Sequence, residues 1–254
     1  MTRLDDLIDD LDALLRPGAF EDYGPNGVQV PGREEVTTVV TGVSASLELF
    51  ERALEHGADL VLVHHGVFWR GAPLSLDRAA AARLRLLLAN DLTLAAYHLP
   101  LDAHPELGNN ALLARTLGAE SWEPFASHRG EPIGVAAYFP GEGLDPRELT
   151  DRVTEACGGR QPLAFLDGPP RVRALGLVSG AGADYLPHAI AAGHDAFLTG
   201  EPAERVMTAA REAGVHFLAA GHYATETFGV RALGDRLAAR FGIQHRFVDV
   251  PNPI

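Results

Sequence analysis

The chain has 254 residues and a formal net charge of −13. Hydrophobic residues make up 46% and charged residues 22%, which is typical of a folded globular protein and excludes a largely disordered chain. The acid excess argues against nucleic-acid binding, because an acidic surface repels phosphate backbones. The one cysteine, Cys157, excludes an internal disulfide framework. There is neither a basic leader nor a membrane-length apolar run, so we expect a cytoplasmic protein with no membrane partner.

Helical and strand patterns alternate along the chain. Leucines at helical spacing predict helices, and β-branched or continuous apolar runs predict buried strands. The predicted helices span 3–16, 46–56, 77–89, 109–117 and 146–156, and the predicted strands span 28–30, 37–41, 59–63, 92–97 and 133–139. This alternation predicts an α/β fold with largely parallel or mixed sheets. The pattern lapses at 119–133, where we expect a boundary.

Short segments of the second half resemble segments of the first. The matched pairs are 41–45 with 176–180, 56–63 with 192–199, and 94–98 with 218–222. Polar residues fall at matched positions, since Asp59 corresponds to Asp195 and His98 to His222. We therefore expect two related α/β halves, 1–126 and 127–254, that face each other across a metal-binding cleft. The alternative is that buried strands simply look alike.

Histidines and carboxylates follow the predicted strands. His98 precedes Asp102 by four residues, and His222 precedes Glu226 by the same spacing. A His64–His65 pair comes directly after the strand at 59–63. In open α/β sheets, ligands bind outside the carboxyl ends of the strands. Imidazole and carboxylate groups gathered there suit a metal site.

The spacing of these residues favours two metal ions over one. His222 and Glu226 share a helix face if a helix begins at Gly221. Adjacent His64 and His65 point to opposite sides of an extended chain, so each would serve one of two neighbouring divalent ions, such as Zn, Fe or Mn. Taken singly, each pattern also fits a structural role: an incidental pair, a solvated surface pair or a buried core histidine.

Two further expectations concern the segment around His98. Pro100 makes a loop the more natural structure between His98 and Asp102. His98 itself is our candidate catalytic residue, for proton transfer, because it closely precedes a proposed ligand and imidazole titrates near neutral pH.

Longer motifs carry a family resemblance. They are Asp22–Val30 (DYGPNGVQV), His64–Trp69 (HHGVFW), Ala96–Ala111, Leu198–Glu201 and Ala220–Glu226. On these motifs, nearly the whole chain resembles the Nif-three-like dinuclear metal-centre family, in its short form. Bacterial members of that family are commonly described as GTP cyclohydrolase I type 2-like proteins.

The resemblance implies a site, an assembly and an activity. The implied metal ligands are His64, His65, Asp102, His222 and Glu226, with Glu226 bridging the two ions. The implied assembly is a ring-shaped homohexamer whose metal sites face an internal cavity.

The implied activity is metal-dependent hydrolysis of a nucleotide-like small molecule; a GTP cyclohydrolase opens the imidazole ring of guanine and releases formate. Two alternatives stay open. One is a dinuclear hydrolase of another small substrate, and the other is a non-catalytic scaffold that binds metal or a partner.

Overall fold

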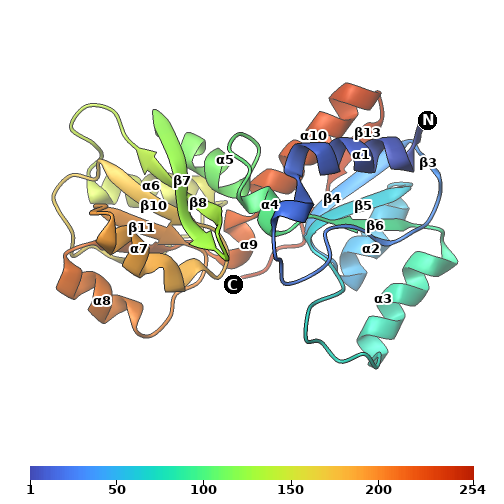
Figure 1. The fold of residues 1–254 in the computed structure, drawn as a ribbon, viewed down its shortest axis with the longest axis horizontal. Coiled ribbons are helices and arrows are strands. Elements are labelled where there is room, and N and C mark those ends of the chain that lie inside the picture. Colours follow the sequence, from blue (N-terminus) through green and yellow to red (C-terminus); the bar gives the residue numbers. More distant parts are fainter. The chain divides into compact units, whose positions relative to one another are not determined.

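The computed structural model describes residues 1–254, which form two compact units with one main sheet each (Figure 1). Unit 1 comprises Met1–Leu101 and Gly229–Val250, and unit 2 comprises Asp102–Phe228 and Pro251–Ile254. The units therefore differ from the consecutive halves 1–126 and 127–254. Residues 102–126 belong to unit 2, and the last long helix of the chain returns to unit 1.

Residues 119–133 form a hairpin within unit 2. Its strands are β7 (Ser121–His128) and β8 (Glu131–Tyr138), which pair antiparallel. Arg129 and Gly130, at φ of 52° and 99°, make the tight turn between them. Because β7 is an edge strand in which only Phe125 is buried, it tolerates Pro124 and polar residues, and this hides its strand pattern.

Unit 1 is built on a five-stranded sheet in the order β13-β4-β5-β6-β2, in which only β2 is antiparallel to its neighbour. The strands of this sheet are β2 (Gly27–Val30), β4 (Thr38–Ser44), β5 (Leu60–His65), β6 (Thr93–Ala96) and β13 (Gln244–Phe247). The unit also has two short strands, β1 (Thr2–Arg3) and β3 (Glu35–Val36), which pair with each other in a separate small sheet. Its helices are α1 (Leu4–Leu15), the 3₁₀ turn η1 (Pro17–Ala19), α2 (Leu47–Glu55), α3 (Arg78–Ala89) and most of α10 (Thr227–Phe241). Side chains of α2 and α3 pack with those of β4 to β6 in one buried core. α1 and α10 lie on the other side of this sheet (Figure 1).

Unit 2 is built on a six-stranded mixed sheet in the order β7-β8-β10-β11-β12-β9. Its remaining strands are β9 (Leu163–Phe165), β10 (Ala174–Val178), β11 (Ala196–Thr199) and β12 (His216–Ala219). Its helices are α5 (Asn109–Thr116), α6 (Pro146–Ala156), the 3₁₀ turn η2 (Gly182–Tyr185), α7 (Leu186–Ala191), α8 (Val206–Ala213) and α9 (His222–Thr225). α5 and α6 pack into the core of one sheet face, while α7 and α8 contact each other. The predicted α/β class with parallel and mixed sheets is confirmed.

The two sheets share an internal arrangement. β4-β5-β6 and β10-β11-β12 are both parallel trios, and each trio ends against an antiparallel strand, β2 or β9. Asp59 Oδ2 accepts hydrogen bonds from the backbone N–H groups of Thr37 and Thr38. Asp195 Oδ2 does the same for Arg173 and Ala174. Asp59 and Asp195, which the sequence repeat matches, therefore bind the backbone at the start of the equivalent strands β4 and β10.

We predict that Asp59→Ala lowers the free energy of unfolding by about 2–3 kcal/mol and Asp195→Ala by about 1 kcal/mol, because Asp59 also binds Arg33 and the Thr37 hydroxyl. Burial acts to raise the pKa of Asp59, but the hydrogen bonds from Thr37, Thr38 and Arg33 hold it below its ordinary value. The stabilisation is therefore complete at neutral pH and disappears as the pH falls through the folded-state pKa. Urea denaturation from pH 7 to pH 3 checks this; an Asp59→Ala deficit that does not shrink at low pH would contradict it.

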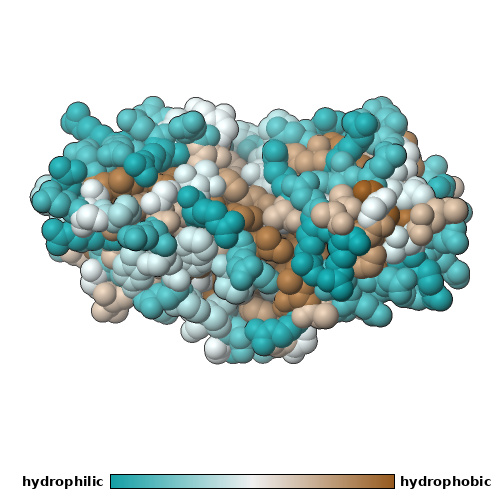
Figure 2. All heavy atoms as spheres, turned by 90° about the horizontal axis from the view of Figure 1, so that it is seen from above, coloured by the Kyte–Doolittle hydropathy of each residue, from teal (hydrophilic) through white to brown (hydrophobic).

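No helix combines the length and the apolar character needed to cross a membrane. The face drawn in Figure 2 is largely hydrophilic, with smaller apolar areas among the polar residues.

Candidate metal centre

Unit 1 brings three histidines together at the carboxyl ends of β5 and β6. His64 and His65 are the last residues of β5, and His98 lies two residues beyond β6. One ring nitrogen of each lies within 4.8 Å of the others. The ring centroid of His64 is 4.7 Å from that of His65 and 4.9 Å from that of His98. Trp69 packs against this group, with its ring centroid 5.3 Å from that of His98.

The three histidines share one feature, which is that Nδ1 is hydrogen-bonded to a protein oxygen. His64 Nδ1 donates to the Tyr97 carbonyl at 2.9 Å, and His65 Nδ1 lies 3.1 Å from the Ser44 hydroxyl. His98 Nδ1 lies 2.7 Å from Asp22 Oδ1. Carbonyl and carboxylate oxygens only accept, so in His64 and His98 the proton is on Nδ1. The Nε2 lone pair is then the one left to bind a metal ion.

Asp22 and Asn26 position His98. Asp22 Oδ2 accepts from the backbone N–H of Leu99, and Asn26 Oδ1 accepts from that of His98. Burial acts to raise the pKa of Asp22, but the hydrogen bond and charge of His98 and the hydrogen bonds from Asn26 and Tyr23 bring it below its ordinary value. An ionised aspartate therefore orients the His98 ring.

Asp102 is the buried carboxylate at the end of a helical turn, α4 (Leu99–Asp102). The loop predicted from Pro100 is wrong, because a proline in the first turn of a helix costs no hydrogen bond and has a suitable φ. Asp102 Oδ1 accepts from Asn109 Nδ2 at 2.8 Å and from the Ser179 hydroxyl at 3.1 Å. These bonds fix the carboxylate in one orientation.

His222 and Glu226 adjoin each other in unit 2, as their spacing predicts. α9 ends at Thr225 and α10 begins at Thr227, so the expected continuous helix is broken at Glu226. His222 Nε2 nevertheless lies 3.2 Å from Glu226 Oε2, and its Nδ1 lies 2.5 Å from Glu201 Oε1. Burial acts to lower the pKa of His222, but Glu226 and Glu201 outweigh it and raise the pKa to about 9. The two carboxylates thus favour positive charge at this position.

The loop after β10 connects Asp102 with the His222–Glu226 pair. Ser179 donates to Asp102, and the next residue is Gly180, at φ +61°. A Cβ atom at Gly180 would lie 2.2 Å from Glu226 Oε1 and 3.0 Å from His222 Nε2. Gly180 is therefore required both by its backbone conformation and by the close approach of two proposed ligands.

Unit 1 thus assembles His64, His65 and His98, and unit 2 assembles Asp102, His222 and Glu226. The chemistry of these donors fits divalent cations, since imidazole and carboxylate ligands are those preferred by Zn, Mn and Fe. Buried carboxylates such as Glu226, which is 3% exposed, are normally paired or bound to metal. Fixed Nδ1–H groups are likewise the usual support of a metal-ligating histidine.

Sequence reasoning missed the supporting residues. Asp22, Asn26, Asn109 and Ser179 hold the proposed ligands, yet none is a metal-binding type at diagnostic spacing. Three of them lie within the motifs DYGPNG and GNN that carry the family resemblance, so the motif was the signal that could have found them. Ser179 lies in the repeat segment 176–180.

The sites define the class of protein, which is a two-unit α/β protein with histidine and carboxylate groups at its strand ends. The sequence model of the Duf34/NIF3 (NGG1p interacting factor 3) family matches residues 2–253. The chain belongs to this family, which confirms the family membership indicated by its motifs.

Bacterial relatives are similar over nearly their full length. A Pseudomonas aeruginosa protein named "GTP cyclohydrolase 1 type 2 homolog" is 46% identical over 250 residues, covering 98% of each chain. A Vibrio cholerae protein of the same name is 43% identical over 249 residues, covering 96% of each.

Solved structures share the fold. The protein ybgI, described as of unknown function, has a TM-score of 0.93 at 40% identity, and TTHA1606 from Thermus thermophilus has 0.90 at 39%. Both comparisons cover 100% of each chain. Reduced HcgD from Methanocaldococcus jannaschii, at 20% identity and a TM-score of 0.84 over 98% of each chain, shares the fold alone.

Proposed function

We propose that this chain holds two divalent metal ions on His64, His65, Asp102, His222 and Glu226, with Glu226 bridging, and hydrolyses a nucleotide-like small molecule. One observation carries the proposal: each of the three proposed histidine ligands, His64, His65 and His222, has Nδ1 bonded to a protein oxygen. These three imidazoles thereby have the Nδ1 support that metal-ligating histidines usually have. An incidental surface or core histidine needs no such uniform support.

The proposed ligands lie near the points where the chain passes from one unit to the other. His98 belongs to unit 1 and Asp102 to unit 2, with α4 running between them. Four residues of even fully extended chain span at most roughly 14 Å. Glu226 in turn directly precedes α10, the helix that carries the chain back into unit 1. Asp102 and Glu226 are thus each within a few residues of a boundary between the units in the sequence.

Divalent ions held here would act as Lewis acids and lower the pKa of bound water. The residues of the chain supply the rest of the chemistry. Asp22 keeps the proton of His98 on Nδ1, which leaves Nε2 to take up or deliver a proton. His98 is therefore the proposed proton-transfer residue, and Asp22 is its positioning residue.

We predict that His98→Gln lowers kcat by about 10²–10⁴-fold and leaves the metal content at two ions per chain, because glutamine carries no titrating proton. Metal analysis and steady-state kinetics on the same preparation check this. A fall in metal content would instead make His98 a ligand. Asp22→Asn, which keeps the shape but removes the charge, is expected to lower kcat by a smaller factor and to change the pH profile.

Release of formate is the test of the substrate. The name GTP cyclohydrolase 1 type 2 homolog belongs to the relatives, and for this chain we propose GTP as the first substrate to examine. Metal-loaded protein is expected to release formate from GTP in proportion to enzyme. If fully loaded protein turns over no nucleotide in a panel, the hydrolase proposal fails and the scaffold alternative is left.

We also propose that the protein is a homo-oligomer, a hexamer. The segment from Phe68 to Leu76 exposes apolar side chains around a cavity of about 650 Å³. Leu74 is 103% exposed, Leu76 58% and Trp69 37%. Neighbouring apolar side chains exposed in this way mark an interaction surface. A second copy of the chain is the occupant that the family resemblance favours.

The oligomer proposal predicts a change of mass on substitution. The double variant Leu74→Asp, Leu76→Asp is expected to give a smaller species than the wild type in light scattering coupled to gel filtration, because it charges the apolar surface. Leu88→Asp, on α3 and 61% exposed, is the matched control that keeps the native mass. A double variant with wild-type mass would contradict this use of the surface.

A further inference from the structure

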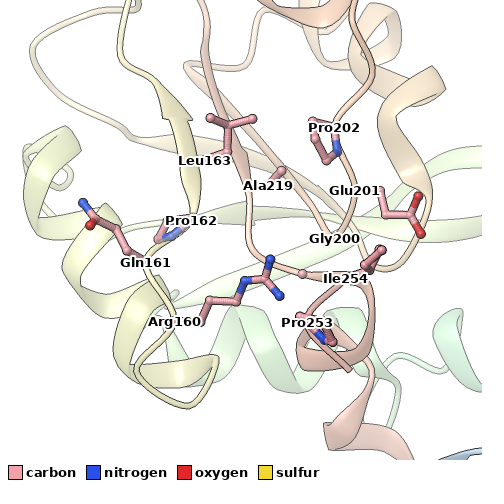
Figure 3. A pocket seen from close by; sticks show the side chains of 11 residues that line it. Arg160, Gln161, Pro162, Leu163, Gly200, Glu201, Pro202, Ala219, Pro253 and Ile254 are labelled. Carbon is pink, nitrogen blue, oxygen red and sulfur yellow. The ribbon is translucent and has the colours of Figure 1, made fainter. Parts of the chain in front are cut away.

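A second concave site lies within unit 2, on the Nδ1 side of His222. It is a cavity of about 540 Å³, a volume within the range of small-molecule sites. Its wall includes Glu201, which accepts from His222 Nδ1, and Gly221, which directly precedes His222. Figure 3 shows the cavity from close by. It adjoins the proposed metal ligand but uses other residues.

Arg160 supplies the positive charge of this cavity. Figure 3 shows its side chain extending among the lining residues, with the guanidinium group between Pro162 and Ile254. A Cβ atom added at Gly221 would lie 3.4 Å from Arg160 Nη1, so the guanidinium passes directly over the residue that precedes His222. Arg160 forms no hydrogen bond or ion pair with the protein, although the chain has 34 acidic residues. Its donors are available to a ligand.

The other walls restrict what that ligand can be. Leu163, Ala219 and Pro253 give an apolar surface, and Leu163 is 49% exposed. Glu201 contributes a carboxylate, of which one oxygen is bound by His222. A negative group is therefore attracted to Arg160 and repelled from Glu201. The ligand that fits carries an oxyanion at one end and an uncharged, apolar body.

We propose that this cavity binds a small organic oxyanion, a carboxylate or phosphate monoester, with the oxyanion on Arg160 and the apolar body against Leu163 and Pro253. Guanidinium groups bind both kinds of oxyanion through paired N–H donors. Glu201 lines the cavity and also accepts a hydrogen bond from His222, a proposed metal ligand. A molecule bound in the cavity would therefore lie next to the side chain that positions His222. The binding itself requires neither metal nor turnover.

The test is a binding titration of full-length protein freed of metal with a chelator, followed by saturation-transfer NMR. The probes are phenyl phosphate, benzoate and phenol, which share an aromatic body and differ in charge. We expect at least one of the two oxyanions to bind about tenfold or more tightly than phenol. The tighter of the two identifies the class of ligand. Equal binding of all three would overturn the proposal.

Variants assign the binding to the cavity. Arg160→Ala is expected to remove the preference for the oxyanion, with about a tenfold or greater loss of affinity, and Arg160→Lys to retain part of it. Arg171→Ala, an exposed arginine of the same unit outside the cavity, is the matched control and is expected to bind as the wild type does. Equal loss in both variants, or loss in neither, would contradict the proposal. Since no metal is present, failure here leaves the metal centre standing, and the converse also holds.

Discussion

Glu226→Gln is expected to lower metal affinity by about 100-fold or more and to abolish turnover. Glu226 is a buried carboxylate that lies 3.2 Å from His222 Nε2, and it is the residue we propose to bridge the two ions. Glutamine has nearly the same shape but no charge, so it is a far weaker metal ligand. Changes to residues that only support a ligand already cost about 10–100-fold, and loss of a ligand costs at least the upper end of that range.

Equilibrium metal binding and formate release measure this prediction together. Glu204→Gln, an exposed glutamate in the same unit, is the matched control and is expected to bind and turn over as the wild type does. If Glu226→Gln keeps two tightly bound ions, Glu226 is not a ligand. Loss of turnover with unchanged metal content would give Glu226 an acid–base role instead.

Gly180→Ala is expected to destroy the metal centre while the fold persists. The added methyl group would lie 2.2 Å from Glu226 Oε1 and 3.0 Å from His222 Nε2, so these side chains have to move. The positive φ of +61° adds backbone strain of about 1–3 kcal/mol. We expect metal affinity to fall by about 100-fold or more, because two ligands are displaced at once.

Gly193→Ala separates the two effects of the Gly180 substitution. Gly193 lies in the same unit at φ +71°, and nothing lies within 4 Å of an added Cβ atom. Both variants bear similar backbone strain and should lose similar unfolding free energy, but only Gly180→Ala should lose metal. Equal metal binding by the two variants would show that Gly180 does not border the site.

The periodicity of the sequence predicts most of the fold, because buried elements have clear patterns. The predicted helix at 146–156 coincides with α6, and the predicted strand at 37–41 overlaps β4. The prediction is wrong at 119–133, where the edge strand β7 is exposed and therefore lacks the alternation of a half-buried strand. The discontinuous unit 1 could not be predicted either, because nothing local shows that α10 packs beside α1.

The residue types and their positions at strand ends predict the proposed metal ligands. They do not predict the residues that hold those ligands by hydrogen bonds. Spacing predicts that His222 adjoins Glu226, as the 3.2 Å distance confirms. The hydrogen bonds of Asp22 to His98 and of Ser179 to Asp102 join residues 76 and 77 positions apart in the chain. Such contacts depend on the folded sheet, so no local pattern predicts them.

A crystal structure of the protein soaked with a divalent metal, with anomalous diffraction recorded at the absorption edge, tests the central claim most directly. The proposal predicts two anomalous peaks per chain, bound by His64, His65, Asp102, His222 and Glu226 and bridged by Glu226. A single peak that stays single at excess metal, or peaks elsewhere in the molecule, would contradict a dinuclear centre on these residues.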